Sequence, residues 1–207
     1  MVSRRFFVGA AVAGLATRAA AAPAALTPAQ GTAPPVDPRL LERALAALER
    51  HAASIVFRDF IGVADFSLAS REPRFHLVSL ANRSVRSHLV AHGRGSDPSR
   101  TGWLQHFSNE PRSNATSAGA YRTGSFYMGA HGHSMRLEGL DASNSNALSR
   151  AIVVHGAWYV SAAMVGYSGV LGRSEGCFAV AASSLPEIMT RLGPGRLIYA
   201  DKAGLTA

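Results

Sequence analysis

The chain has 207 residues, of which 47% are hydrophobic. That length and composition suit a single domain with one apolar core and exclude a chain that is disordered throughout. The formal net charge is +8; without Arg4, Arg5 and Arg18, 18 basic residues against 13 acidic ones leave +5. A basic chain associates readily with anionic surfaces, but net charge says nothing about the chemistry of a site.

Residues 1–22 have the order of a signal peptide. Arg4 and Arg5 precede a short apolar run that ends at Leu15, and an alanine-rich stretch follows. The run is shorter than the ~20 residues that a spanning helix needs, so we interpret the segment as cleaved, with an uncleaved anchor as the alternative. The paired arginines followed by Phe7 resemble a twin-arginine signal, which predicts export of the folded protein to the periplasm.

The folded domain is expected over residues 37–207. Residues 23–36 are rich in Ala, Pro, Thr and Gly, which predicts a flexible lead-in. Asp37 before Pro38 is typical of a helix start, and the leucines and alanines that follow at helical spacing predict an amphipathic helix to about Ala52.

After this helix the sequence is typical of an antiparallel β protein. Short runs rich in Val, Ile, Phe, Leu and Tyr are separated by Gly, Asn, Ser and Pro. Ala81-Asn82-Arg83 predicts a hairpin, and a capping box of Ser184 with Glu187 predicts a late helix that ends at the glycines beyond it. The expected strands are residues 56–66, 75–80, 85–91, 125–128, 134–137, 150–155 and 197–199.

Cys177 is the single cysteine, so no disulfide can form within the chain. A free thiol is either a small core residue or a reactive group. Glycines stand at 172 and 176 beside this thiol, and His155 ends an apolar run over residues 151–154. Acyl transfer by cysteine needs a thiolate, an imidazole and backbone N–H donors. We therefore predict a site that joins Cys177 and His155, with a core histidine and an inert thiol as the alternative.

His155-Gly156 at a strand end, followed by a loop and Ser174-Glu175-Gly176-Cys177, resembles the YkuD-type L,D-transpeptidase domain. The resemblance extends over most of residues 55–200, through residues 90–96, 107–109, 119–121 and 127–132. It implies a mainly β (α+β) fold, a sandwich or barrel-like domain with a few short helices. It also implies peptidoglycan stem peptides as the partner, with no cofactor or metal, no nucleic acid, and no membrane contact beyond export; the oligomeric state stays open.

The resemblance also implies catalytic roles. Cys177 would attack a carbonyl to form a thioester, and His155 would hold the thiolate and relay protons. The carbonyl of Gly156 would orient the imidazole, and the N–H groups of Gly176 and Cys177 would form the oxyanion hole.

Four further residues are assigned to the substrate on the same basis. Arg173 binds carboxylates by type, which stem peptides carry, although a structural arginine is the alternative. Ser174, His131 and Tyr127 belong to the matching segments and are expected to line the cleft.

Two positions beside the thiol depart from the usual pattern. Glu175 stands where the family usually has histidine, and Ala179 replaces a basic or amide residue. The motif is similar to a divergent proteobacterial branch associated with crosslinks from L-Ala at stem position 1 to diaminopimelate at position 3. A carboxylate at 175 would repel an acidic donor terminus and an alanine at 179 would leave room, so we expect 1–3 links in preference to 3–3 links.

Other functions remain open at this point. A 3–3 transpeptidase or an L,D-carboxypeptidase would use the same fold, and an inert wall-binding module would keep only the scaffold. A zinc peptidase would use His131 and His133, which face the same way if they share a strand, with His92 or Asp97 as a further ligand. Papain-like and NlpC/P60-like enzymes are excluded, because their cysteine precedes its histidine and no histidine follows Cys177.

Overall fold

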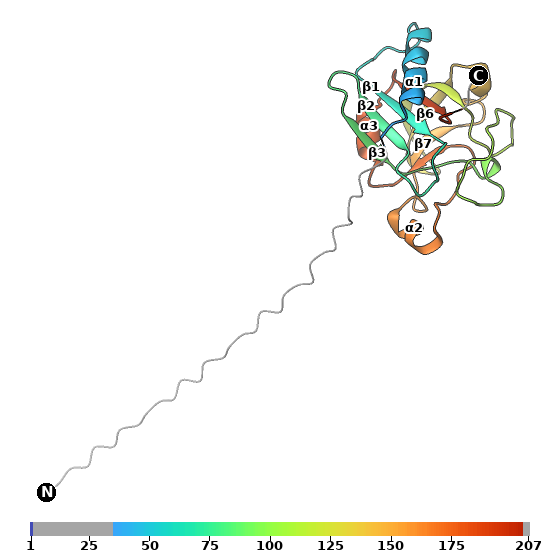
Figure 1. The fold of residues 1–207 in the computed structure, drawn as a ribbon. Helices are drawn as coiled ribbons and strands as arrows, with labels where there is room; N and C mark the ends of the chain where they lie inside the picture. The colour runs from blue at the N-terminus through green and yellow to red at the C-terminus, as the bar shows by residue number, and fades with distance from the viewer. Residues whose placement is uncertain (2–34, 205–207) are drawn as a thin grey trace. The chain divides into compact units, whose positions relative to one another are not determined.

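The structure is a computed structural model that describes Met1 and residues 35–204 (Figure 1). The predicted signal peptide and nearly all of the predicted lead-in lie outside these residues, so their prediction stays untested. Within the described part, no helix is long and apolar enough to cross a membrane.

Helix α1 (Pro38–Arg50) begins where the sequence predicts and ends slightly earlier. The Asp37 carboxylate accepts hydrogen bonds from the N–H groups of Arg39 and Leu40, at 2.9 and 3.0 Å, so the first turn is capped. The apolar face of the helix buries Leu40 and Leu48 against strands at the centre of the sheet. Burying each leucine contributes about 2 kcal/mol, which attaches the helix to the sheet.

The described residues form one nine-stranded sheet in the order β3-β2-β1-β9-β5-β6-β7-β8-β4. Strands β3 and β4 are separated by a single residue in the chain, yet they occupy opposite ends of this order. The sheet must therefore curl until its two ends meet, which gives the mainly β, barrel-like architecture expected from the sequence. The strands are β1 (Phe60–Asp65), β2 (Phe75–Ser79), β3 (Val85–His88), β4 (Val90–Ala91), β5 (Gly119–Gly129), β6 (Gly132–Gly139), β7 (Val153–Gly156), β8 (Phe178–Val180) and β9 (Leu197–Asp201).

Most strand pairs are antiparallel, as the sequence predicts, but two pairs are parallel. Strand β1 pairs with β9 in parallel, and β7 pairs with β8 in parallel. A parallel pair needs a crossover rather than a tight turn, and the β7 to β8 crossover carries helix α2 (Ala162–Ser168). Figure 1 shows α2 projecting from the domain, and none of its residues is buried.

Several predicted boundaries were also wrong, each for a local reason. The strand expected from residue 56 begins only at Phe60, because the N–H groups of Val56 and Phe57 donate to Gly195 O at 2.9 and 3.1 Å. The strand expected over residues 85–91 is divided into β3 and β4. Helix α3 (Leu185–Arg191) forms without the predicted capping box, since the Ser184 side chain makes no capping bond.

Three buried clusters hold the elements together. The largest lies inside the curled sheet and includes Phe66, Tyr121 and Phe178, whose rings contact one another edge to face or tilted. The second lies between α1 and the sheet. The third packs the crossover onto β4 and β8, and consists of Ala91, Ala157, Val160, Leu171 and Ala179. This third cluster fixes the segments on both sides of Cys177. Within residues 35–204 the remaining elements are two short 3-10 helices, η1 (Arg94–Ser96) and η2 (Ala142–Asn144).

Candidate active site

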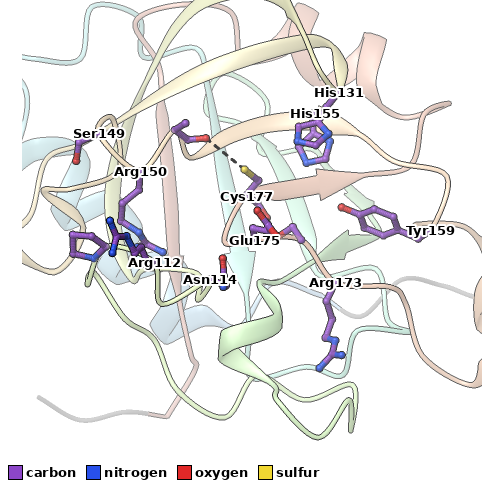
Figure 2. A pocket seen from close by; sticks show the side chains of 13 residues that line it. Arg112, Asn114, His131, Ser149, Arg150, His155, Tyr159, Arg173, Glu175 and Cys177 are labelled. Atoms are coloured by element: carbon purple, nitrogen blue, oxygen red, sulfur yellow. Dashed lines mark hydrogen bonds between the residues drawn. The ribbon is translucent and has the colours of Figure 1, made fainter.

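The parallel pair β7 and β8 brings the predicted nucleophile and base together. Val154 pairs with Phe178 and His155 pairs with Ala179, so Cys177, just before β8, lies beside the start of β7. Both Cys177 and His155 line one cavity of about 740 Å³ (Figure 2). The fold thus places a thiol and an imidazole, 22 positions apart in the chain, in the same cleft.

The Cys177 thiol is nearly buried, with 9% of the residue exposed. Its sulfur lies 3.6 Å from the carbonyl oxygen of Ala151, the contact drawn as a dashed line in Figure 2. Burial raises the pKa of Cys177; the Val153 N–H lowers it, Glu175 raises it and the Arg150 charge lowers it. The resting thiol is therefore protonated at neutral pH and donates to the Ala151 carbonyl.

The His155 imidazole is held from two sides. Its Nδ1 lies 3.0 Å from the carbonyl oxygen of Gly156, and its ring stacks on that of His131 with 4.3 Å between centroids. A carbonyl can only accept, so Nδ1 carries the proton and Nε2 is left as the basic atom. Burial lowers the pKa of His155, the Gly156 bond raises it, and His131 lowers it. The ring is thus a neutral base at pH 7.

The loop before Cys177 is tightly packed and uses one of the predicted oxyanion donors. Gly176 has a φ of +114°, and a Cβ there would lie 2.7 Å from Ala115 O, so only glycine fits. The Gly176 N–H donates to Ser174 Oγ at 3.2 Å, and Ser174 Oγ donates to the Cys177 carbonyl at 2.7 Å. In this resting state the Gly176 N–H is occupied. Ser174 is largely buried and braces the loop, and it also lines the cavity, as the sequence predicted.

Two residues predicted to bind substrate make other contacts, although Arg173 is among the residues that line the cavity. The Arg173 guanidinium donates to the carbonyl oxygens of Asp97 and Pro98, and Figure 2 shows it directed away from Cys177. Tyr127 is not among the residues lining the cavity; its ring packs under the Arg136 guanidinium at 4.3 Å. Arg173 therefore ties two loops together, and Tyr127 packs on the surface of the β5 and β6 hairpin.

The two unusual residues beside the thiol do not act as the sequence suggested. Glu175 forms an ion pair with Arg94 at 2.9 Å, so a countercharge already accompanies its carboxylate. Ala179 is completely buried in the third cluster and borders no open space. The ion pair with Arg94 weakens the repulsion that was expected from the Glu175 carboxylate, and the buried Ala179 leaves no extra room for the donor stem.

The cavity has further lining residues that sequence reasoning missed. Arg112 and Asn114 adopt left-handed backbone conformations, with φ of 65° and 53°, and no local sequence motif predicts these conformations. Arg150 lies only five positions before His155, and this proximity was the one feature of the sequence that could have placed Arg150 at the site. The missed set is Pro111, Arg112, Asn114, Ser149, Arg150, Ala151 and Tyr159.

The histidines considered for zinc do not converge. His131 lies in the turn between β5 and β6 and stacks on His155, whereas His133 lies on β6 and packs against Phe126 at 5.5 Å. His92 is buried, and its Nδ1 lies 2.8 Å from Nη2 of Arg74. Across residues 35–204, no three His, Cys, Asp or Glu side chains are grouped as metal ligands.

Comparisons with known proteins agree with this arrangement. A family profile described as an L,D-transpeptidase catalytic domain, YkuD_2, matches residues 32–200, which is most of the chain. No curated protein sequence matches it.

Solved structures with a similar fold share little sequence identity with the chain. The LD transpeptidase LdtMt1 in complex with imipenem is 19% identical with a TM-score of 0.41, over 69% of this chain and 59% of that one. An L,D-transpeptidase from Mycobacterium smegmatis is 15% identical with a TM-score of 0.42, over 69% and 58%. The helical cell shape determining protein Pgp2 from Campylobacter jejuni is 12% identical with a TM-score of 0.47, over 78% and 54%. The chain thus spans less than two thirds of each of these proteins.

Because the family profile covers so much of the sequence, the chain belongs to the L,D-transpeptidase catalytic domain family.

Proposed function

We propose that this protein is an exported peptidoglycan L,D-transpeptidase that works through a thioester on Cys177. The observation that carries the proposal is the cavity that Cys177 and His155 share. A nearly buried thiol and a neutral imidazole meet there from two adjacent strands, and the chain belongs to this family. Export by the twin-arginine route to the periplasm belongs to the same proposal and rests on Arg4, Arg5 and the apolar run after them.

The geometry supports a two-step acyl transfer. The Cys177 sulfur attacks the carbonyl carbon of the donor stem while its proton passes to Nε2 of His155. The peptide C–N bond then breaks, and the proton on Nε2 goes to the leaving amine. An acceptor amine attacks the thioester and gives a proton to His155, after which the C–S bond breaks. Cys177 leaves as the thiolate and takes back the proton from Nε2.

The oxyanion of each tetrahedral intermediate needs a donor that is free. In the described residues the Cys177 N–H has no hydrogen-bond partner, whereas the Gly176 N–H donates to Ser174 Oγ. We assign the Cys177 N–H as the first donor; the Gly176 N–H joins it once the Ser174 hydroxyl turns away.

Arg112 replaces Arg173 as the proposed carboxylate contact. It is exposed at the cavity, and its guanidinium has no ion pair or hydrogen bond within the described part of the chain. The other arginines that line the cavity, Arg150 and Arg173, are bonded to neutral oxygens. Since stem peptides carry carboxylates, an unpaired guanidinium at the cleft suits them.

The preference for 1–3 over 3–3 links is the finer part of the proposal. Its support is now the Ser174-x-Gly176-Cys177-x-Ala179 motif alone, because Glu175 is paired and Ala179 is buried.

Intact-protein mass spectrometry tests the thioester. The domain over residues 37–207 is incubated with a tetrapeptide stem and a separate amine acceptor, and a mass increase that disappears with Cys177→Ala is expected. Product with the acceptor amine indicates a transpeptidase, and product with water indicates a carboxypeptidase. Binding to sacculi with neither adduct nor product would mean an inert wall-binding module.

A further inference from the structure

Arg150 makes several hydrogen bonds at the cavity wall and has no role in the proposed mechanism so far. Its Nη1 donates to the Ser108 carbonyl at 2.8 Å and to Ser117 Oγ at 2.7 Å. Its Nη2 donates to Ser113 Oγ at 3.2 Å and to the Ala115 carbonyl. Four bonds from one guanidinium thus join four points of the loop that forms one wall of the cavity.

All four acceptors are uncharged. Arg150 makes no ion pair with a carboxylate in the part of the chain that the structure describes, and arginine stays protonated in proteins. The side chain is only partly exposed, so water screens it incompletely. Burial lowers the pKa of Arg150, and the Glu110 carboxylate is near enough to raise it but makes no ion pair with the guanidinium. The cavity wall therefore carries a positive charge with no directly bonded anion among the described residues.

This charge lies against the loop that carries the thiol. A Cβ on Gly176 would be 3.2 Å from Arg150 Nη2, and Gly176 immediately precedes Cys177. Figure 2 shows Arg150 and His155 on different sides of Cys177. The guanidinium is thus placed to act on the sulfur without competing with the imidazole.

The chain after Arg150 acts on the same sulfur. The Ala151 carbonyl lies 3.6 Å from Sγ, and Ala151 has a left-handed φ of 54° that turns the chain there. The Val153 N–H lowers the pKa of the thiol, and His155 follows two residues later. One short segment therefore supplies the acceptor for the thiol proton, a backbone group that favours the thiolate, and the base.

We propose that Arg150 is a positioning residue that holds the cavity wall and stabilises the thiolate of Cys177 by its positive charge. The inference rests on the proposed function in taking Cys177 as the nucleophile. It accounts for how a nearly buried thiol reaches its anionic form, which is costly without a nearby positive charge.

Other titratable groups near the sulfur do not supply that charge. Glu175 is anionic, and the phenols of Tyr121 and Tyr159 are neutral because burial raises their pKa values. Burial lowers the pKa of His155, which disfavours a resting imidazolium, and His131 stacks on that ring. Of the remaining cavity arginines, Arg173 points away and Arg112 lies at the exposed rim.

The test measures thiol alkylation by iodoacetamide against pH, which needs no substrate. For Arg150→Gln we expect alkylation at pH 8 to slow about tenfold, the change that loss of a close opposite charge produces. Glu175→Gln removes an anion and should accelerate alkylation. Arg173→Gln, a cavity arginine that also bonds to neutral carbonyls, should leave the rate unchanged.

Circular dichroism and thermal unfolding establish that each variant is folded. A folded Arg150→Gln protein that alkylates like the wild type overturns the proposal. Should Arg150→Gln fail to fold, Arg150→Lys decides, because lysine keeps the charge without the four bonds. Alkylation within about threefold of wild type is then expected, and a tenfold loss in folded protein contradicts the electrostatic role. A wild-type protein that forms no acyl-enzyme would instead refute the proposed function, whatever the alkylation rates.

Discussion

Cys177 and His155 share a cavity in the resting structure, but the thiol proton points to the backbone rather than to the imidazole. The sulfur contacts the Ala151 carbonyl, and the imidazole is fixed by Gly156 and His131. Both reacting groups are therefore neutral at rest, and proton transfer accompanies attack on the substrate. This differs from a preformed thiolate and imidazolium pair, and it makes the charge around the sulfur important.

His155 should set the acid limb of the pH profile. Because burial lowers its pKa, the base stays neutral to a pH below its ordinary value of about 6.5, and kcat/KM should fall only below that value. In His131→Ala, the ring that covers His155 is lost and the pKa rises towards the ordinary value. The midpoint of the acid limb should therefore move to higher pH. An unchanged midpoint in a folded His131→Ala enzyme would show that the stacked ring does not tune the base.

Arg112 and Arg173 offer a matched pair for the substrate carboxylate. In Arg112→Gln we expect KM for a stem peptide to rise about tenfold with kcat little changed, since one charge-assisted bond contributes about 1.5–3 kcal/mol. In Arg173→Gln the thermal midpoint should fall instead, because the bonds to the Asp97 and Pro98 carbonyls are lost. Steady-state kinetics beside thermal melts check both, and a reversed pattern would restore Arg173 as the carboxylate contact.

At the residue scale, rare residue types in a short motif were enough to predict a site that joins Cys177 and His155, and both residues line one cavity. The sequence could not reveal that the Arg173 guanidinium donates to backbone carbonyls, or that Ala179 is buried in the third cluster. Those facts depend on contacts between segments some 75 positions apart, such as Arg173 with Asp97 and Pro98. The same limit hid Arg112, which reaches the cavity only through the course of a long loop.

At the scale of elements, β8 is the strand that places the thiol, and it is only three residues long. Its length is too short for a period-two pattern to be recognised, and its partner β7 is parallel, so no hairpin signal precedes it. Helix α1, which has a cap and a clear period, was predicted closely, whereas β5 (Gly119–Gly129) was predicted only over residues 125–128. The elements nearest the chemistry were the ones that the sequence specified least.

Buried histidine in β2 should make the sheet sensitive to acid. His76 is fully buried between β2 and β3, its Nδ1 is 2.8 Å from Ser87 Oγ, and its Nε2 has no partner. Burial lowers the pKa of His76 to about 4, whereas the unfolded chain takes up the proton near 6.5. The unfolded state therefore binds more protons below pH 6.5, and stability falls as the pH drops from 6.5 towards 4.

For His76 alone this loss is about 2 kcal/mol between pH 7 and pH 5. A His76→Leu variant that folds should lose less stability over that range, as measured by urea unfolding at the two pH values. His133→Gln, which replaces an exposed histidine on β6, serves as the control and should keep the wild-type pH dependence. Equal acid sensitivity in His76→Leu and wild type would show that His76 does not cause it.

At the scale of the whole molecule, the curl of the sheet brings segments that are distant in the sequence together around one cleft. The ends β3 and β4 meet, the crossover between β7 and β8 packs onto β4, and the loop bonded by Arg150 closes the opposite wall. The fold class followed from composition and motif order, but the closure of the sheet could not, because it depends on the order of strands in space. The cavity is a consequence of that closure.

The most direct test of the central claim is mass analysis of muropeptides after purified domain is incubated with sacculi. The proposal predicts new dimers that are absent with Cys177→Ala, whose fold should persist because alanine removes little packing volume. Fragmentation should place the link at L-Ala of the donor and diaminopimelate of the acceptor. Dimers joined only 3–3 and dependent on Cys177 would keep the enzyme class and refute the 1–3 preference. Unchanged muropeptides with wild-type protein, or the same new dimers with Cys177→Ala, would contradict the proposed transpeptidase mechanism.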